Sequence, residues 1–138
     1  MSLDFLLDGA NWSGVEGFPH RILQHLGYSG MALAIALLIA LPLGLYIGHT
    51  GRGALLAINL GNAGRALPTL GVLMLVLSVG GIGLKPVIVA LVVLAVPPLL
   101  TATYAGIRSV DPAVVDAARG IGLRERQIVL QVEVPLAR

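Results

Sequence analysis

The sequence has few charged residues, few aromatic residues and no cysteine. Charged residues make up 12% of the chain and aromatic residues 4%, whereas hydrophobic residues make up 57%. An ordinary soluble domain is about 25% charged, so this composition argues against that class. The absence of cysteine leaves no disulfide to consider. It says little about compartment, because membrane proteins of every compartment can lack cysteine.

Several functional motifs are absent as well. The chain has no Walker motif, and its segment GGIGLKP at 80–86 lacks the Gly-Lys-Ser/Thr ending that holds phosphates, so the chain does not hydrolyse ATP on its own. No cluster of His, Cys and carboxylates indicates a metal, and we expect no cofactor. No ionisable residue lies at the centre of an apolar stretch, although proton relays, ion pumps and voltage sensors generally need one. This argues against a self-contained secondary transporter.

Long uncharged stretches dominate what is present. The segments 26–48, 66–84 and 86–107 contain no Asp, Glu, Lys or Arg. A helix needs about 20 apolar residues to cross the hydrocarbon of a bilayer, so we predict an all-α membrane protein with three transmembrane helices at about these positions. The alternative is a soluble core with three buried helices. It is disfavoured because a small soluble domain cannot cover them.

Features within and between these stretches predict local structure. The apolar segment 52–65 is too short to span, and we expect a helix at the interface or one leading into the second span. Pro42 and the prolines listed below should bend or break their helices. Gly44 and Gly48 form a GxxxG pattern that permits close helix approach, although chance explains it equally well. Candidate pathway-lining residues are Pro68, Thr69, Pro97, Pro98, Thr101 and Tyr104, with hydrogen bonding to kinked backbone as the alternative role.

Basic residues predict the orientation. Three spans place segment 1–25 and the turn at Lys85 on one side with two basic residues, whereas the other side carries seven. The positive-inside rule therefore places the N-terminal segment outside and the tail 108–138 in the cytoplasm. The first residues, which include Asp4 and Asp8, do not resemble a cleavable signal peptide. The histidines that flank the first span are interpreted as interfacial: His20, His25 and His49.

The tail 108–138 differs from the rest because charges recur every few residues. Asp111 followed by Pro112 is typical of a helix start, since Asp caps free N–H groups and Pro fits the first turn. Gly122 can take the left-handed conformation that ends a helix, and a second helix is predicted from about 124 to 132, closing at Pro135. The first helix has an apolar face at helical spacing, formed by Ala113, Val114, Ala117, Ala118 and Ile121.

Two functions suit this helix–turn–helix tail. Several arginines on two short helices are compatible with a DNA-binding module. Such a module needs polar, base-reaching side chains on its second helix, which here reads IVLQV. A small-residue face followed by a tight glycine turn fits insertion into a groove on a partner protein better. We predict protein docking and no nucleic-acid partner, with a membrane-anchored DNA-binding regulator as an alternative.

The spacing of the tail resembles the EAA motif of binding-protein-dependent ABC importer permeases. That motif reads Glu-Ala-Ala, three residues, Gly, nine residues, Ile-x-Leu-Pro; here Asp replaces Glu, and valines replace Ile and Leu. The segments ALPTLGVL, VPPLLTATYAGIRSVDPAVVDAARGIG and EVPLA are similar to permeases of glycine betaine, choline and osmoprotectant importers. The resemblance covers about 26–138. The residues that match the motif are Asp116, Ala117, Ala118, Gly122, Val132, Val134 and Pro135.

The resemblance implies a mechanism and a set of partners. Two permease subunits, the same or homologous, form the solute pathway among the lipids of the bacterial inner (plasma) membrane, and two ATPases lie beneath them. The EAA segment is the coupling helix that fits a groove on each ATPase, and an extracytoplasmic solute-binding protein delivers the solute. The expected function is a permease subunit, not an enzyme in itself, of an ABC importer for glycine betaine, choline or a related osmoprotectant.

The solute is less well determined than the class. A quaternary ammonium group is held by a cage of aromatic rings, and this chain has only one Trp, three Tyr and two Phe, so we expect the cage mainly in the binding protein. A permease for another small solute such as an amino acid, or an unrelated small membrane channel or carrier, stays as an alternative. Family members continue past the EAA segment with further spans. We therefore expect this chain to be a partial permease that supports no uptake.

Overall fold

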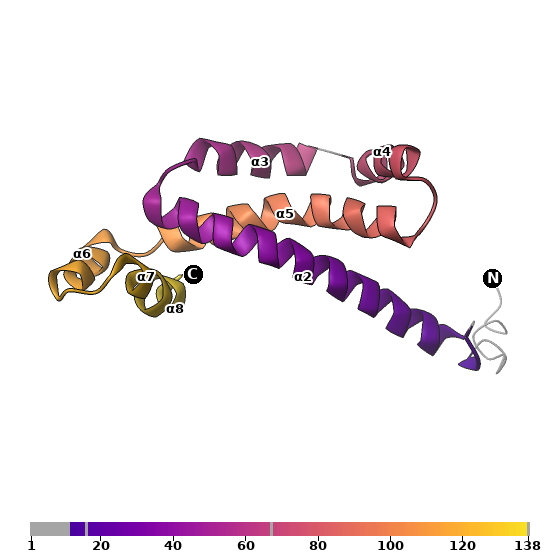
Figure 1. The fold of residues 1–138 in the computed structure, drawn as a ribbon, viewed down its shortest axis with the longest axis horizontal. Coiled ribbons are helices and arrows are strands. Elements are labelled where there is room, and N and C mark those ends of the chain that lie inside the picture. Colours follow the sequence, from indigo (N-terminus) through magenta and orange to yellow (C-terminus); the bar gives the residue numbers. More distant parts are fainter. Residues whose placement is uncertain (1–11, 16, 67, 138) are drawn as a thin grey trace, which may run out of the picture.

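The computed structural model describes residues 12–15, 17–66 and 68–137, and within these residues the chain is all-helical, without a strand (Figure 1). This confirms the predicted all-α membrane class. Four longer helices form the main body, and a set of short helices follows at one end of it (Figure 1). The elements are α2 (Phe18–Thr50), α3 (Ala54–Ala66), α4 (Thr69–Gly80), α5 (Leu84–Arg108), α6 (Pro112–Gly120), α7 (Glu125–Ile128), the π-helix η2 (Val129–Glu133) and α8 (Val134–Leu136).

Two helices are long and apolar enough to cross a membrane, α2 and α5. The third predicted span, 86–107, corresponds closely to α5. The first predicted span, 26–48, lies within α2, which has 33 residues and begins at Phe18. Such a helix is about 50 Å long, which exceeds the roughly 30 Å hydrocarbon thickness. Helix α2 therefore extends into the segment 1–25 that was assigned outside the membrane region.

The second predicted span is not a single helix. Helix α4 has 12 residues, about 18 Å, and it meets the preceding helix at a bend of 95°. The bend lies at Pro68, which has an extended conformation and precedes the first residue of α4. Proline lacks the N–H that a helix interior needs, so an uncharged stretch alone does not ensure a continuous helix. By length and composition, the described residues contain two helices able to span a membrane, or three spans if the bent pair α3 and α4 counts as one.

Helices α2 and α5 lie side by side in parallel, along a row of small residues on α2 (Figure 1). A Cβ atom placed on Gly44 would lie 2.6 Å from Thr103 Cβ, and one on Gly48 would lie 2.7 Å from Ile107 Cβ. The GxxxG pattern therefore does permit close approach, and the partner is α5 of the same chain. The buried residues on this face of α2 recur at a spacing of about four: Ala32, Ala36, Ala40, Gly44, Ile47 and Gly48.

Helix α3 packs against the opposite flank of α5, at the point where α5 contains two consecutive prolines. A Cβ atom on Gly64 would lie 2.8 Å from Pro97 Cβ, and one on Gly61 would overlap Thr101. The predicted helix at 52–65 is thus confirmed as α3, which forms the bent pair with α4. Of the two predicted effects of proline, bending or breaking, α2 and α5 show no break, since both helices continue through Pro42 and Pro97. A proline inside a membrane helix is tolerated when neighbouring helices pack closely and satisfy the backbone groups that it leaves without a partner.

Candidate coupling segment

The tail begins with a capped helix, as the sequence predicts. Helix α6 starts at Pro112, and the backbone N–H of Ala113 donates to Asp111 Oδ1 at 2.8 Å. This bond satisfies one of the free donors of the first turn, and proline costs nothing at this position because its missing N–H would have no partner there. The start of α6 is therefore fixed by local sequence alone.

The end of α6 is a Schellman turn centred on Gly122. Gly122 has a φ of +87°, its N–H donates to the carbonyl of Arg119 at 2.9 Å, and the N–H of Leu123 donates to the carbonyl of Ala118 at 3.1 Å. These are the two reverse bonds that define this motif. The predicted left-handed conformation of Gly122 is confirmed, and it sets the direction in which the chain leaves α6.

The second helix of the tail does not close at Pro135. Helix α7 passes directly into the π-helix η2 and then into α8, which includes Pro135 and ends at Leu136. The N–H of Val134 donates to the carbonyl of Val129, five residues earlier. A π turn inside a helix is rare and is frequent at functional sites. The prediction that the helix ends at 132 was wrong because the wider turn allows the helical path to continue past the proline.

Helix α6 has one face against the protein and one face exposed. Ala118 is buried at 6% exposure, so its small side chain packs within the tail. The rest of the same apolar face is accessible beside Ala118, and Ile121 at its end is 80% exposed. We use the name "exposed α6 face" for these residues: Ala113, Val114, Ala117 and Ile121.

An ion-pair network holds the turn between α6 and α7. Arg119 Nε donates to Glu125 Oε1 at 2.9 Å, Arg119 Nη2 donates to Glu125 Oε2 at 3.1 Å, and Arg119 Nη1 donates to Asp116 Oδ1 at 3.2 Å. The hydrogen bond from Arg119 lowers the pKa of the Glu125 carboxyl below its usual value, and the Glu125 carboxylate in turn raises the pKa of Arg119. The acidic residue of the EAA-like motif, Asp116, therefore pairs within its own segment.

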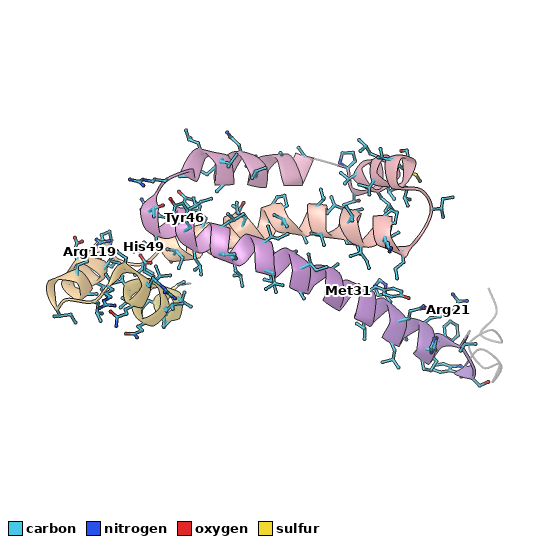
Figure 2. All side chains as sticks on the ribbon, viewed as in Figure 1. Arg21, Met31, Tyr46, His49 and Arg119 are labelled. Carbon is cyan, nitrogen blue, oxygen red and sulfur yellow. The ribbon has the colours of Figure 1, made fainter. Side chains whose placement is uncertain are left out.

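The network continues to the end of α2 through His49. His49 Nε2 lies 2.8 Å from Glu125 Oε2, and His49 Nδ1 lies 2.8 Å from Glu133 Oε2. Figure 2 shows His49 at the end of α2 nearest the tail, with Arg119 on the tail itself. The interpretation of His49 as merely interfacial was wrong. A sequence signal was present, because Glu133 is a lone carboxylate in the apolar stretch VLQVEVPL, and a buried carboxylate needs a partner.

The candidate pathway residues lie at different places in the fold. Thr101 lies between α3 and α5, where its hydroxyl is 2.9 Å from the carbonyl of Pro97 and 3.3 Å from that of Ala57. Tyr104 packs against the buried cluster that includes Leu100. Pro68 and Thr69, at the bend before α4, are exposed. The structure thus brings Thr101 and the two prolines of α5 next to α3.

The remaining motif residues lie in the second half of the tail. Val132 is half-buried in η2, whereas Val134 and Pro135 are exposed on the helix that follows. Within the described part of the chain, no group of three or more His, Cys, Asp or Glu side chains is arranged to hold a metal ion. The chemistry of the tail is therefore that of hydrogen bonds, ion pairs and an apolar surface.

The fold and the tail define a helical membrane protein whose spans carry a capped, turn-linked helical segment at one end. Residues 35–138 match the family model of the binding-protein-dependent transport system inner membrane component, and the chain belongs to this family. Its location is therefore a membrane.

Relatives with curated names are about a third identical to the chain over the aligned residues. It is 35% identical to the choline transport system permease protein OpuBB of Bacillus subtilis, over 86% of this chain and 54% of that protein. It is 37% identical to the osmoprotectant import permease protein OsmY of Salmonella typhimurium, over 83% and 49%. It is 32% identical to the glycine betaine/proline betaine permease ProW of Escherichia coli, over 77% and 30%. The chain spans about half the length of the first two. No solved structure matches it significantly.

Proposed function

We propose that this chain acts as a permease subunit of an ABC importer for glycine betaine, choline, carnitine or a related osmoprotectant. The observation that carries the proposal is the tail, in which an apolar face of a capped helix is exposed next to a glycine turn. The names of the relatives, all transport permeases, support the class of solute. ATP hydrolysis then belongs to a separate subunit.

In this proposal the exposed α6 face is the surface that enters a groove on the ATPase. Four small or medium apolar side chains on a short helix present a narrow ridge to a partner. Gly122 sets the angle between this ridge and the helix α7 that connects to the rest of the tail. Ala118, in contrast, supports the ridge from inside, since it is buried within this chain. Asp116 orients Arg119 through their hydrogen bond.

The other partners follow from the same proposal. A second permease subunit, the same or homologous, covers helix faces that carry many exposed apolar side chains, and an extracytoplasmic binding protein delivers the solute. The solute pathway is proposed to include Thr101 and Pro97, Pro98 and Tyr104 nearby, with Pro68 and Thr69 at the bend. The tail faces the cytoplasm, where the ATPase is, and the beginning of α2 faces outside. The count of basic residues on the two sides supports this orientation.

Association with the ATPase tests the proposal directly. Ala117→Arg places a charge in the middle of the exposed α6 face, and we expect loss of co-purification with the cognate ATPase from membranes. Leu130→Arg is the matched control, because Leu130 is also exposed in the tail but lies outside this face. The control should retain the ATPase. If Ala117→Arg inserts normally and retains the ATPase as the parent does, the exposed α6 face is not the docking surface.

A further inference from the structure

The side chain of His49, on the last turn of α2, contacts two separate parts of the tail. Its ring nitrogens lie 2.8 Å from Glu125 Oε2 of α7 and 2.8 Å from Glu133 Oε2 of η2. The His49 side chain is 11% exposed and that of Glu133 is 6% exposed, whereas Glu125 is 57% exposed. The contact with Glu133 is therefore largely shielded from solvent, and the two contacts join α2 to helical segments more than seventy residues later in the chain.

The two contacts restrict the protonation of His49 and Glu133 together, because Glu133 Oε2 can either accept from the ring or, if protonated, donate to it. A neutral imidazole has one N–H and one nitrogen lone pair, so it can donate to only one of two ionised carboxylates, and the other contact would place a lone pair against a negative oxygen. An imidazolium donates from both nitrogens. Glu125 is held in its ionised form by Arg119, whose hydrogen bond lowers the pKa of that carboxyl. Two protons on the imidazole satisfy both contacts at once.

The π-helix is what allows both carboxylates to reach one histidine. An α-helix turns about 100° per residue, so two residues eight positions apart, such as Glu125 and Glu133, point about 80° away from each other on a regular helix. A π turn takes more residues per revolution. The five residues of η2 between Ile128 and Val134 therefore turn through a smaller total angle than they would in an α-helix. This reduces the angle between the directions of Glu125 and Glu133 around the helix axis, and the two side chains converge on the same side.

Other charged groups surround the histidine from each neighbouring element. Asp116 and Arg119 of α6 and Arg108 at the end of α5 line a polar cavity together with His49 and Glu133. Arg126 of α7 lines the groove on the other side of His49. Of these groups, Arg119 is bound to Glu125 and Asp116. Arg119 is thus shared between Glu125 and Asp116, whereas Glu133 contacts the ring of His49.

We propose that His49, doubly protonated between Glu125 and Glu133, is the positioning residue that fixes the tail to the end of α2. The π-helix η2 is the element that brings the second carboxylate to it. The role in coupling rests on the proposed function, since the tail carries the exposed α6 face.

The protonation state can be read without any substitution. In the full chain in lipid nanodiscs, labelled with ¹⁵N-histidine, both His49 nitrogens should show the signature of N–H at neutral pH. The signals of the three histidines are assigned with His20→Asn, His25→Asn and His49→Asn. An unprotonated Nδ1 or Nε2 of His49 at neutral pH overturns the proposal. This outcome includes the case in which Glu133 holds the proton instead of the ring.

The positional role is measured by the distance between α2 and the tail. The chain has no cysteine, so spin labels at Leu38→Cys and Ile121→Cys, both exposed positions, report only this distance. We expect one narrow distribution for the parent at neutral pH, and loss of it in His49→Asn and Glu133→Gln. His25→Asn, on the exposed part of the same helix, is the control and should match the parent.

A narrow, parent-like distribution in both His49→Asn and Glu133→Gln would show that the link does not position the tail. The labelled chain is measured without the ATPase, so the result is independent of whether the exposed α6 face docks. If Ala117→Arg retains the ATPase but the distance experiment gives the expected loss, the proposed docking fails and the positioning role of His49 stands. If Ala117→Arg loses the ATPase but both His49→Asn and Glu133→Gln keep a narrow, parent-like distribution, the proposed docking stands and the His49 proposal alone fails.

Discussion

Gly48 of α2 lies against Ile107 of α5 so closely that a Cβ atom on the glycine would be 2.7 Å from Ile107 Cβ. One turn earlier, Gly44 has the same relationship with Thr103. The backbone of α2 at these two glycines therefore lies directly against side chains of α5. Ile107 is itself buried and immediately precedes the tail, so this contact connects the packing of the spans to the position of the tail.

A methyl group at Gly48 should separate the two helices. Gly48→Ala overpacks the contact and is expected to cost about 1–3 kcal/mol, seen as a lower midpoint of thermal unfolding in detergent. Gly30→Ala is the matched control on the same helix, because nothing lies within 4 Å of a Cβ atom there. Ala is the better helix former, so the control should be neutral or slightly more stable. Equal midpoints for both variants would contradict the close contact.

The turn at Gly122 should be sensitive to backbone conformation rather than to space. Gly122→Ala places a Cβ atom on a residue with φ of +87°, which costs roughly 1–2 kcal/mol, although nothing lies within 4 Å of that atom. We expect faster hydrogen exchange of the amides of Gly122 and Leu123, which close the turn. Gly120→Ala has the same open space without the positive φ and should leave exchange unchanged. Slow exchange in both variants would refute a required left-handed conformation.

Acid should weaken the pair formed by Arg119 and Glu125. The pKa of Glu125 is lowered in the folded chain, first by the hydrogen bond from Arg119, so the unfolded state binds the proton more readily. The stabilisation is therefore complete above the ordinary carboxyl value of 4.5 and is lost as the pH falls through the lowered pKa. A carboxyl ¹³C titration should give a midpoint below 4.5 for Glu125, and Arg119→Gln should raise it. An unchanged midpoint in Arg119→Gln would assign the shift to another cause.

Thr101 offers a test that separates a structural role from a pathway role. Its hydroxyl lies within hydrogen-bond distance of backbone carbonyls of α5 and α3, and removing such a hydrogen bond costs about 1 kcal/mol. We expect Thr101→Val to lower the thermal midpoint, and Thr101→Ser, which keeps the hydroxyl, to stay closer to the parent. If the midpoint of Thr101→Val is unchanged, the hydroxyl does not hold α3 on α5 and the pathway role gains support.

Orientation is accessible through single cysteines, because the chain has none of its own. Val15→Cys and Ile121→Cys are both highly exposed, at 77% and 80% in the parent residues. On intact cells, a membrane-impermeant thiol reagent should label position 15 and leave position 121 unlabelled until the cells are opened. Labelling of position 121 alone on intact cells would reverse the proposed orientation.

Several features of this protein were determined by the sequence itself. The helix start at Asp111, the left-handed turn at Gly122 and the helix break before Thr69 depend on one or two residues whose backbone preferences no distant contact needs to support. The apolar stretches of α2 and α5 follow from composition, since uncharged segments of this length fit the bilayer. The spacing of the tail residues also indicated the family before any geometry was known.

Tertiary structure decided the features that depend on contacts between distant segments. No local preference predicts that η2 adopts a π turn and carries the helix through Pro135, that Ala118 is buried while Ala117 is exposed, or that Gly48 faces Ile107. The same holds for His49, whose meaning depends on carboxylates 76 and 84 positions away. Each of these outcomes depends on which surfaces meet when α2, α5 and the tail pack together. The packing energy is a property of the two segments in contact, so the sequence of either segment alone does not determine it.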